Sequence, residues 1–322
     1  MNFKETQIAI HQLRNFFQNQ LEANLNLVPV TGPIILDPET GLNDHLSNEK
    51  YRAVSFHADA LEQKLEIVQS LAKWKRYALT KYQYNLYEGI YVDMKAIRAH
   101  ESLDNLHSLF VDQWDWELMI KPEDRTIEFL QNTVNKIYDA IHKSQLHMKQ
   151  LYPHLNQTLP DEVKFFSSQE LEDLYPNEDF ELITNKITKV YKAVFIMQIG
   201  KKLNSKRVFD TRSAEYDDWD LNGDLFLWSD AINQAIEISS MGIRVDANSL
   251  IKQAKIKDDK KVLNPYFNAV INNEICQSIG GGIGQSRLIM FLLEKKHIGE
   301  VQVSTWDQKN LELADKENIK LL

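Results

Sequence analysis

Apolar residues recur at helical spacing in two long stretches of this sequence. Residues 6–21 have apolar side chains three or four positions apart, at Ile10, Leu13, Phe17 and Leu21. Residues 127–141 follow the same rule, at Ile127, Leu130, Val134, Ile137 and Ile141. Apolar positions at this period form one stripe along a helix, so both stretches are predicted to be helices that pack against a core.

Strand-like patterns separate these helices. Residues 107–118 alternate in polarity, which predicts a strand with Gln113, Asp115 and Glu117 on one face and Trp114 and Trp116 on the other. Further strands are predicted within 28–36 and over 65–69, 193–199, 223–228 and 235–245, and further helices over 70–82 and from Gly284 to about Lys296. Strands alternate with both loops and helices, without a strict βαβ repeat. The expected fold class is therefore α/β (α+β), with a mainly antiparallel central sheet flanked by helices.

Composition and charge narrow the class of protein. The 322 residues are 43% hydrophobic, and no long linker divides them, so we expect one domain over residues 1–322 with a helix at 1–22 packed on its core. A net charge of -9 gives no sequence-wide reason to bind nucleic acid or an anionic membrane. A single cysteine, no signal-peptide pattern and no apolar run of about 20 residues favour the cytoplasm.

The first group of candidate site residues combines Arg98 with the polar face of the 107–118 strand. Arg98 ends the segment before the charged loop 99–105, which predicts a hairpin with an arginine at its root. The two donors of a guanidinium fork suit a phosphate or a carboxylate, and a row of polar groups suits an amino-acid head group. The alternative is a half-exposed strand with a solvated polar face.

The second group is the glycine-rich segment 280–287, which ends in Arg287. Glycines let the backbone approach a ligand closely, and the helix predicted after them would offer free amide groups to an anion. A cation in the first turn of a helix opposes the helix dipole, so Arg287 makes more sense if it faces an anion. The alternative is a flexible turn. The segment fits neither a Walker loop nor a dinucleotide fingerprint.

Two further groups are weaker. Asp224 and Glu237 lie in consecutive predicted strands, and their carboxylates could share Mg²⁺ if those strands pair, with Arg244 as a phosphate contact. The alternative is two exposed carboxylates at strand ends. Three cations lie at the start of a predicted helix: Lys73, Lys75 and Arg76. They could bind a carboxylate, and the alternative is a solvated basic face of the helix.

Taken together, four strings resemble the ammonia-dependent asparagine synthetase (aspartate–ammonia ligase) family. They are residues 70–76, 107–117, 237–246 and 279–288, and the likeness covers nearly the whole chain. The resemblance implies the catalytic core of a class II aminoacyl-tRNA synthetase, the aspartyl enzyme in particular, usually as a homodimer. The chain departs from the second class motif, since Glu101 follows Arg98 one place later than in Arg-x-Glu. It also departs in the third motif, where Gln285-Ser286 replaces the more usual residues before Arg287.

The resemblance also assigns roles residue by residue. It implies contacts of aspartate with Asp44, Ser70, Lys75, Gln113, Asp115 and Gly282. It implies contacts of ATP with Arg98, Glu101, Asp217, Asp224, Glu237, Ser240, Arg244 and Arg287. Asp224 and Glu237 match the Mg²⁺-binding acids, and Arg98, Lys75 and Asp115 are the expected catalytic residues.

The reaction implied joins ATP, L-aspartate and ammonia to give AMP, pyrophosphate and L-asparagine through a β-aspartyl-adenylate. Asp115 or Asp217 would take the proton of ammonium. Two other classes of function compete with this one: a synthetase relative that acts on tRNA or a protein lysine, and a catalytically dead regulatory paralogue. The acidic charge and the short segment before the first strand disfavour the former, and the joint presence of arginines, acids and the glycine segment disfavours the latter.

Overall fold

The computed structural model describes residues 1–44, 52–257 and 264–322. Its helices are α1 (Phe3–Leu25), α2 (Ala72–Lys81), α3 (Ile127–Leu151), α4 (Ser168–Leu174), α5 (Phe180–Tyr191), α6 (Ala247–Lys257), α7 (Pro265–Ile271), α8 (Gln285–Leu292) and α9 (Gln308–Glu317). Its strands are β1 (Leu27–Pro29), β2 (Ile35–Leu36), β3 (Ser55–Ala58), β4 (Gln63–Ile67), β5 (Gly89–Ile97), β6 (Phe110–Met119), β7 (Lys164–Ser167), β8 (Ala193–Met197), β9 (Asp217–Ser229), β10 (Gln234–Arg244) and β11 (Ser278–Gly284). Within these three ranges, no helix has the length and apolar content needed to cross a membrane.

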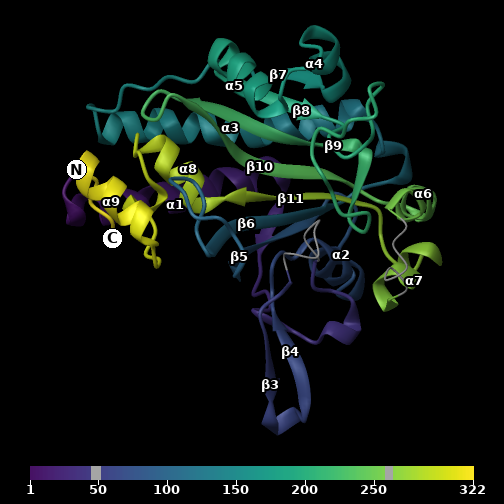
Figure 1. Cartoon of the computed structure of the whole chain (residues 1–322). Helices are drawn as coiled ribbons and strands as arrows, with labels where there is room; N and C mark the ends of the chain where they lie inside the picture. The colour runs from purple at the N-terminus through teal and green to yellow at the C-terminus, as the bar shows by residue number, and fades with distance from the viewer. Residues whose placement is uncertain (45–51, 258–263) are drawn as a thin grey trace.

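The centre of the molecule is an eight-stranded sheet in the order β1-β5-β6-β11-β10-β9-β8-β7. The outermost pairings, β1 with β5 and β7 with β8, are parallel, and the pairings between them are antiparallel. Helices flank this sheet (Figure 1). The mainly antiparallel sheet predicted from the sequence is therefore confirmed. A smaller sheet has the order β2-β4-β3, and its β3–β4 hairpin projects away from the large sheet (Figure 1).

Strand β6 separates the apolar core from the polar side of the sheet. Trp114 and Trp116 are fully buried in the main core cluster, and the ring of Trp114 lies 4.5 Å from that of Phe17 in α1. Asp115 and Glu117 point to the other face, because side chains alternate along a strand. The predicted alternation is confirmed, and the strand has its polar row where a ligand could reach it.

The two predicted amphipathic helices are confirmed as α1 and α3, which pack against each other. Leu13, Phe17 and Leu21 of α1 have no exposed surface, and burying a side chain of this size stabilises the fold by about 1.5–3 kcal/mol. The N-terminal helix therefore belongs to the core that supports β6.

Several predicted boundaries and one interpretation are wrong. Strand β6, for example, starts at Phe110 rather than at residue 107. Strand β9 starts at Asp217 rather than at residue 223, because Asp217 and Asn222 pair with Arg244 and Gly242 of β10. Several residues in this part of the strand are poor strand formers: Asp217, Asp218, Asp220 and Asn222. Helix α8 ends at Leu292 instead of continuing to about Lys296, since Glu294 has a φ of 52°. Residues 280–284 form strand β11 in the centre of the sheet, so the interpretation of this segment as a flexible turn is wrong.

Candidate active site

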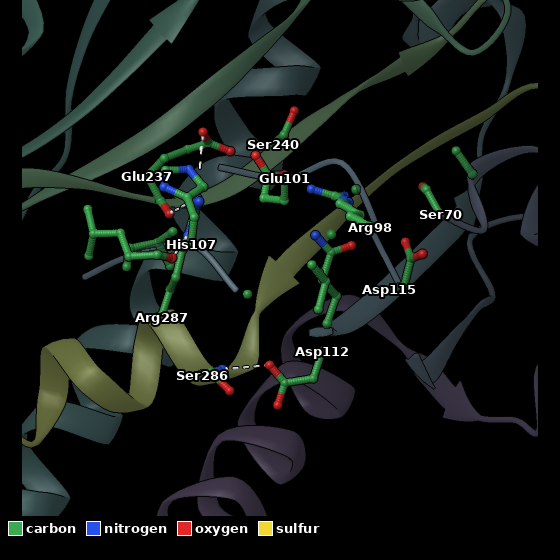
Figure 2. A pocket seen from close by; sticks show the side chains of 18 of the residues that line it. Ser70, Arg98, Glu101, His107, Asp112, Asp115, Glu237, Ser240, Ser286 and Arg287 are labelled. Atoms are coloured by element: carbon green, nitrogen blue, oxygen red, sulfur yellow. Dashed lines mark hydrogen bonds and ion pairs between the residues drawn. The ribbon is translucent and has the colours of Figure 1, made fainter. Parts of the chain in front are cut away.

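A cavity of about 290 Å³ opens on the polar side of the sheet, above β6, β9, β10 and β11. It brings together most of the residues that the sequence singled out: Ser70, Arg98, Glu101, Gln113, Asp115, Asp217, Glu237, Ser240, Arg244, Gly282 and Arg287. Figure 2 shows Ser70 and Asp115 at one end and Glu237 and Arg287 at the other, with Arg98 between them in this view. Residues more than 200 positions apart therefore share one site.

Arg98 directly follows β5 and faces this cavity from the hairpin loop. Its backbone amide donates to Leu109 O at 2.8 Å, which confirms the predicted hairpin with an arginine at its root. The side chain is half-buried and makes no hydrogen bond or ion pair to any residue that the structure describes, and its buried Nε lacks a partner. Burial lowers the pKa of Arg98 and outweighs the nearby charges of Glu101 and Glu237, which raise it without making an ion pair. An anion is the missing partner for such a group.

Arg287 and Glu237 form the far end of the cavity. The Arg287 guanidinium donates to Glu237 O at 3.1 Å and lies 3.7 Å from Glu237 Oε2 (Figure 2). The predicted anion site at the start of α8 is not supported. The backbone amide of Ser286 already donates to Oδ1 of Asp112 at 3.1 Å, and the other oxygen of Asp112 accepts from Arg14 at 3.0 Å. Arg287 itself, rather than the helix terminus, is the group that faces the cavity.

Arg212 lines the cavity and was missed by the sequence analysis. It donates to Asp224 Oδ2 and, at 2.8 Å, to Ser240 Oγ, and its Nε lies 3.0 Å from Asp210. Asp224 is not among the lining residues, but it is register-paired with Ser240, so β9 and β10 pair as the metal hypothesis required. No local pattern marks Arg212, because its hydrogen-bond partners, Asp224 and Ser240, lie on strands that follow it.

Asp224 and Glu237 act on each other electrostatically. Burial raises the pKa of Asp224, and the charge of Glu237 raises it further. Burial also opposes ionisation of Glu237, but Arg287 and Arg212 outweigh this effect and lower its pKa. Oδ1 of Asp224 is buried and has no hydrogen-bond partner. Two neighbouring carboxylates with a vacant oxygen are a donor set that fits a hard cation such as Mg²⁺.

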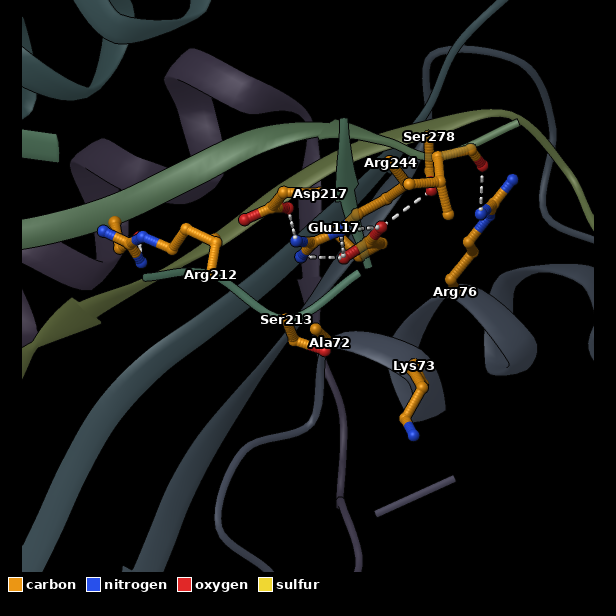
Figure 3. Close-up of polar contacts among 12 residues, drawn as sticks. Ala72, Lys73, Arg76, Glu117, Arg212, Ser213, Asp217, Arg244 and Ser278 are labelled. Carbon is orange, nitrogen blue, oxygen red and sulfur yellow. Dashed lines mark hydrogen bonds and ion pairs between the residues drawn. The ribbon is translucent and has the colours of Figure 1, made fainter. Parts of the chain in front are cut away.

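Beneath the cavity lies a buried ion-pair cluster, which we define as Lys75, Asp115, Glu117, Asp217 and Arg244 (Figure 3 shows its Glu117–Arg244–Asp217 part). Arg244 binds Glu117 through Nε and Nη2, at 2.9 and 2.7 Å, and binds Asp217 through Nη1. Its role as a phosphate contact stays a prediction, since it would compete with these pairs. Burial raises the pKa of Asp115 and of Asp217, whereas for Glu117 the Arg244 charge outweighs burial and lowers the pKa.

Lys75 has no exposed surface and donates to three acceptors: Asp115 Oδ1, Trp116 O at 2.8 Å and Gly281 O at 3.3 Å. An ammonium group has three protons, so all are engaged. Lys75 fixes the Asp115 carboxylate in this arrangement. If Lys75 is to bind the substrate carboxylate, as predicted, one of these three hydrogen bonds must break. That contact stays a prediction.

The other cations of the 70–76 string are also internal. Lys73 pairs with Glu215 at 2.8 Å, and Arg76 donates to the carbonyl groups of Cys276 and Val245 at 2.7 and 2.8 Å. Both side chains are fully buried, so the interpretation as a solvated basic face is wrong. Asp44 lies beneath the same helix, where it accepts from the amides of Ala72 and Lys73 at 2.6 and 3.2 Å. It therefore caps α2 and is not among the cavity-lining residues.

Two glycines of β11 make room for the polar groups of β6. A Cβ at Gly280 would lie 2.0 Å from Glu117 Oε2 and 2.6 Å from Arg244 Nη2. A Cβ at Gly282 would lie 2.4 Å from Gln113 Oε1. The two glycines are thus needed inside the sheet, because they leave room for charged and polar side chains of the neighbouring strands.

Comparison with known proteins gives a consistent result. A profile described as aspartate-ammonia ligase matches residues 4–318. The aspartate–ammonia ligase of Ureaplasma parvum serovar 3 is 51% identical over 321 residues, which are 99% of this chain and 97% of the relative. The protein of the same name from Clostridium tetani is 46% identical over 325 residues, which are 100% of this chain and 95% of the relative.

Solved structures that resemble this one are class II aminoacyl-tRNA synthetases. Asparaginyl-tRNA synthetase from Pyrococcus horikoshii, complexed with asparaginyl-adenylate, aligns with a TM-score of 0.66 and 14% identity, over 92% of this chain and 68% of that chain. The aspartyl enzyme of Entamoeba histolytica gives 0.60 and 18%, over 94% of this chain and 59% of that chain. At such identities the likeness concerns the fold, and it confirms the expected class II catalytic core.

Proposed function

Because this chain belongs to the aspartate-ammonia ligase family, and is thus an enzyme that forms asparagine from aspartate and ammonia, we propose that it first transfers AMP from ATP to the aspartate β-carboxylate. Pyrophosphate leaves in this step, and ammonia then displaces AMP. The observation that supports the proposal best is Arg98, a cavity-facing guanidinium that has no partner in the described chain. An α-phosphate with an adjoining carboxylate is a ligand of matching charge and geometry.

Adenylation solves a chemical problem of this reaction. A carboxylate is a poor electrophile, because its charge repels a nucleophile and oxide is a poor leaving group. Attachment of AMP supplies a leaving group, so the enzyme needs no covalent nucleophile of its own. Its tasks are to hold the two substrates in line and to stabilise the charge that develops at phosphorus.

The cavity divides these tasks between its two ends. Arg98 would bind the α-phosphate, and Arg287, next to Glu237, would face the adenine and phosphate end. Ser70, Gln113 and Asp115 would hold aspartate at the other end. Lys75 supports this end from below, because it fixes the Asp115 carboxylate. Asp44 would support it indirectly, through the N-terminus of α2.

Asp224 and Glu237 would hold the magnesium ion that accompanies ATP. Bound there, the ion would neutralise charge on the phosphates. Two carboxylates suffice for this, since Mg²⁺ in nucleotide sites takes its other ligands from phosphates and water. Among the described residues no cluster of three or more acids, histidines or cysteines could hold a metal by itself. Oδ1 of Asp224 is vacant already, whereas Oδ2 becomes available only if Arg212 gives it up.

The adenylate intermediate itself is suggested by the fold. The asparaginyl-tRNA synthetase of similar fold is described as complexed with asparaginyl-adenylate, an intermediate of the same chemical class. A homodimer stays a prediction that rests on the resemblance. A cytoplasmic location and a single catalytic domain stay predictions that rest on the composition and patterns of the sequence. Light scattering of the purified protein during size-exclusion chromatography tests the dimer directly.

The deciding experiment follows ATP, AMP, pyrophosphate and asparagine with purified protein, Mg²⁺, L-aspartate and ammonium. Equal amounts of AMP and asparagine, formed only when every substrate is present, support the proposal. Formation of an adenylate without asparagine would mean that the natural acceptor is another molecule. ADP and phosphate in place of AMP and pyrophosphate would show that the carboxylate is phosphorylated instead, and the adenylate would be wrong.

A further inference from the structure

Asp217 presents a carboxylate oxygen that no described residue uses. The side chain is 3% exposed and lies at the floor of the cavity. Its Oδ1 accepts from Arg244, while Oδ2 has no hydrogen bond in the described chain. In Figure 3 the contact drawn from Asp217 runs to Arg244, and the free oxygen points away from it.

Asp115, the other acid considered for the same task, differs in this respect. Oδ1 of Asp115 accepts from Lys75, and its Oδ2 accepts from the amide of Leu71 at 3.1 Å. Both of its oxygens are therefore committed to the protein. The structure thus distinguishes Asp217 from Asp115 as a proton acceptor, although the sequence alone favoured neither of them.

The buried ion-pair cluster beneath the cavity also has an excess of negative charge. It contains the carboxylates of Asp115, Glu117 and Asp217 but only the cations of Lys75 and Arg244. Burial of a charge is costly unless it is paired, so a cluster with one uncompensated carboxylate attracts a cation. Arg212 also acts on Asp217 from the side of the cavity, but its hydrogen bonds go to Asp224 and Ser240.

We propose that the free oxygen of Asp217 binds the ammonium ion and takes its proton, so that ammonia is released as the nucleophile inside the cavity. This inference rests on the proposed function, since it needs an adenylate for ammonia to attack. Burial raises the pKa of the Asp217 carboxyl, which makes it a better proton acceptor than an exposed aspartate.

The step balances as follows. Ammonium gives one proton to Asp217 Oδ2 and becomes ammonia. The nitrogen lone pair forms a bond to the β-carbonyl carbon of the adenylate, and the bond from that carbon to the AMP oxygen breaks with its electron pair. The nitrogen loses its second surplus proton to the departing AMP phosphate. Asp217 returns its own proton to water when the products leave.

Two half-reactions test this role separately. Aspartate-dependent exchange of labelled pyrophosphate into ATP, without ammonium, reports on adenylation alone. Asparagine formation reports on both steps. Hydroxylamine is a third probe, because at neutral pH it is largely uncharged and needs no base to become a nucleophile; its product is β-aspartyl hydroxamate.

The variant is Asp217→Asn, which can still offer Oδ1 to Arg244. We expect pyrophosphate exchange to change by only a small factor, while asparagine formation from ammonium falls by about 10²–10⁴, the usual contribution of a general base. Hydroxamate formation should fall far less than asparagine formation. Asp217→Glu keeps a carboxylate and should restore part of the ammonium reaction, which also covers the case in which the Asn variant does not fold.

Asp218→Asn is the matched control. Asp218 is the next residue of β9, is equally a buried aspartate paired with an arginine, Arg125 at 2.7 Å, but does not line the cavity. We expect both half-reactions to be retained in this variant. Undiminished asparagine formation in Asp217→Asn would overturn the proposal. So would a parallel loss of exchange and amide formation with a higher KM for aspartate or for ATP, since Asp217 would then bind the α-ammonium group of aspartate or contact ATP, as the resemblance implies. An absence of exchange in the unmodified enzyme would instead count against the adenylate mechanism.

Discussion

Arg212 donates to Oδ2 of Asp224, so a protein cation already pairs with one oxygen of the acid that is proposed to bind magnesium, while its Oδ1 has no partner. The same arginine donates to Ser240 at 2.8 Å, on the strand that also contains Glu237. Arg212 thus neutralises this end of the cavity in the free enzyme. Binding of the metal and release of the arginine are therefore expected to be coupled.

Replacement of Arg212 by Gln should make the fold more dependent on magnesium. Without the guanidinium, the buried Asp224 carboxylate loses its partner, and we expect a loss of roughly 3 kcal/mol in the free energy of unfolding. Thermal unfolding with Mg²⁺ and with a chelator measures the compensation. The Tm of Arg212→Gln should rise more on addition of Mg²⁺ than the Tm of the unmodified protein.

Arg207→Gln provides the control for this comparison, because Arg207 belongs to the same connection between β8 and β9 but pairs with Glu172, away from the cavity. Its response to Mg²⁺ should equal that of the unmodified protein. The coupling is refuted if magnesium raises the Tm of all three proteins equally.

Loss of the Lys75 ammonium should destabilise the protein strongly. Lys75→Met keeps the apolar stem but leaves Asp115 buried without its cation, and breaking a buried pair in this way costs about 3–5 kcal/mol. Urea unfolding at neutral pH measures the difference. Lys81→Met is the matched control, since Lys81 lies on the same helix but is exposed, and a change of less than about 0.5 kcal/mol is expected. Similar losses in the two variants would contradict the structural role of Lys75.

The sequence predicted local features better than long-range ones. The alternation of β6 and the stripes of α1 and α3 are visible in the chain because each depends on neighbours a few residues away. The position of Arg98 beside the polar row of β6 follows from a hairpin, which is also local. The hairpin and the polar row of β6 together form one side of the cavity.

The remaining features depend on residues far apart in the chain. Lys73 and Glu215 are 142 residues apart, and Arg76 and Cys276 are 200 apart, so no pattern along the chain distinguishes a buried ion pair from a solvated basic face. Arg212 was missed for the same reason. The glycines of β11 were interpreted as a ligand-binding segment or a flexible turn, although the requirement that excludes larger side chains comes from β6 and β10.

Acid should remove a contribution of Asp104 to stability. Burial alone would raise the pKa of Asp104, but hydrogen bonds from His107 and from the amides of Leu106 and His107 lower it to about 2. A carboxyl with a lowered pKa in the folded state stabilises the protein above its unfolded pKa, near 4, and this contribution is lost as the pH falls toward 2. The group is half exposed, so the contribution should not exceed about 1 kcal/mol.

The comparison uses Asp104→Asn and urea midpoints at pH 6 and at the lowest pH at which both proteins are folded. The variant should be less stable at pH 6, and the difference should shrink as the pH is lowered. A difference that is independent of pH would mean that the hydrogen bonds act without regard to the charge of Asp104.

Addition of one methyl group at Gly280 should disrupt the buried ion-pair cluster. The new Cβ would lie 2.0 Å from Glu117 Oε2 and 2.6 Å from Arg244 Nη2, and the Glu117–Arg244 pair cannot move without loss of its hydrogen bonds. Overpacking of this kind costs about 1–3 kcal/mol, and displacement of the pair should also reduce asparagine synthesis. Gly284→Ala is the control, because its Cβ would meet its nearest neighbour, Cβ of Arg287, at 3.4 Å, an ordinary contact. If Gly280→Ala is as stable and as active as Gly284→Ala, then close packing of Glu117 and Arg244 against β11 is not what requires a glycine at position 280.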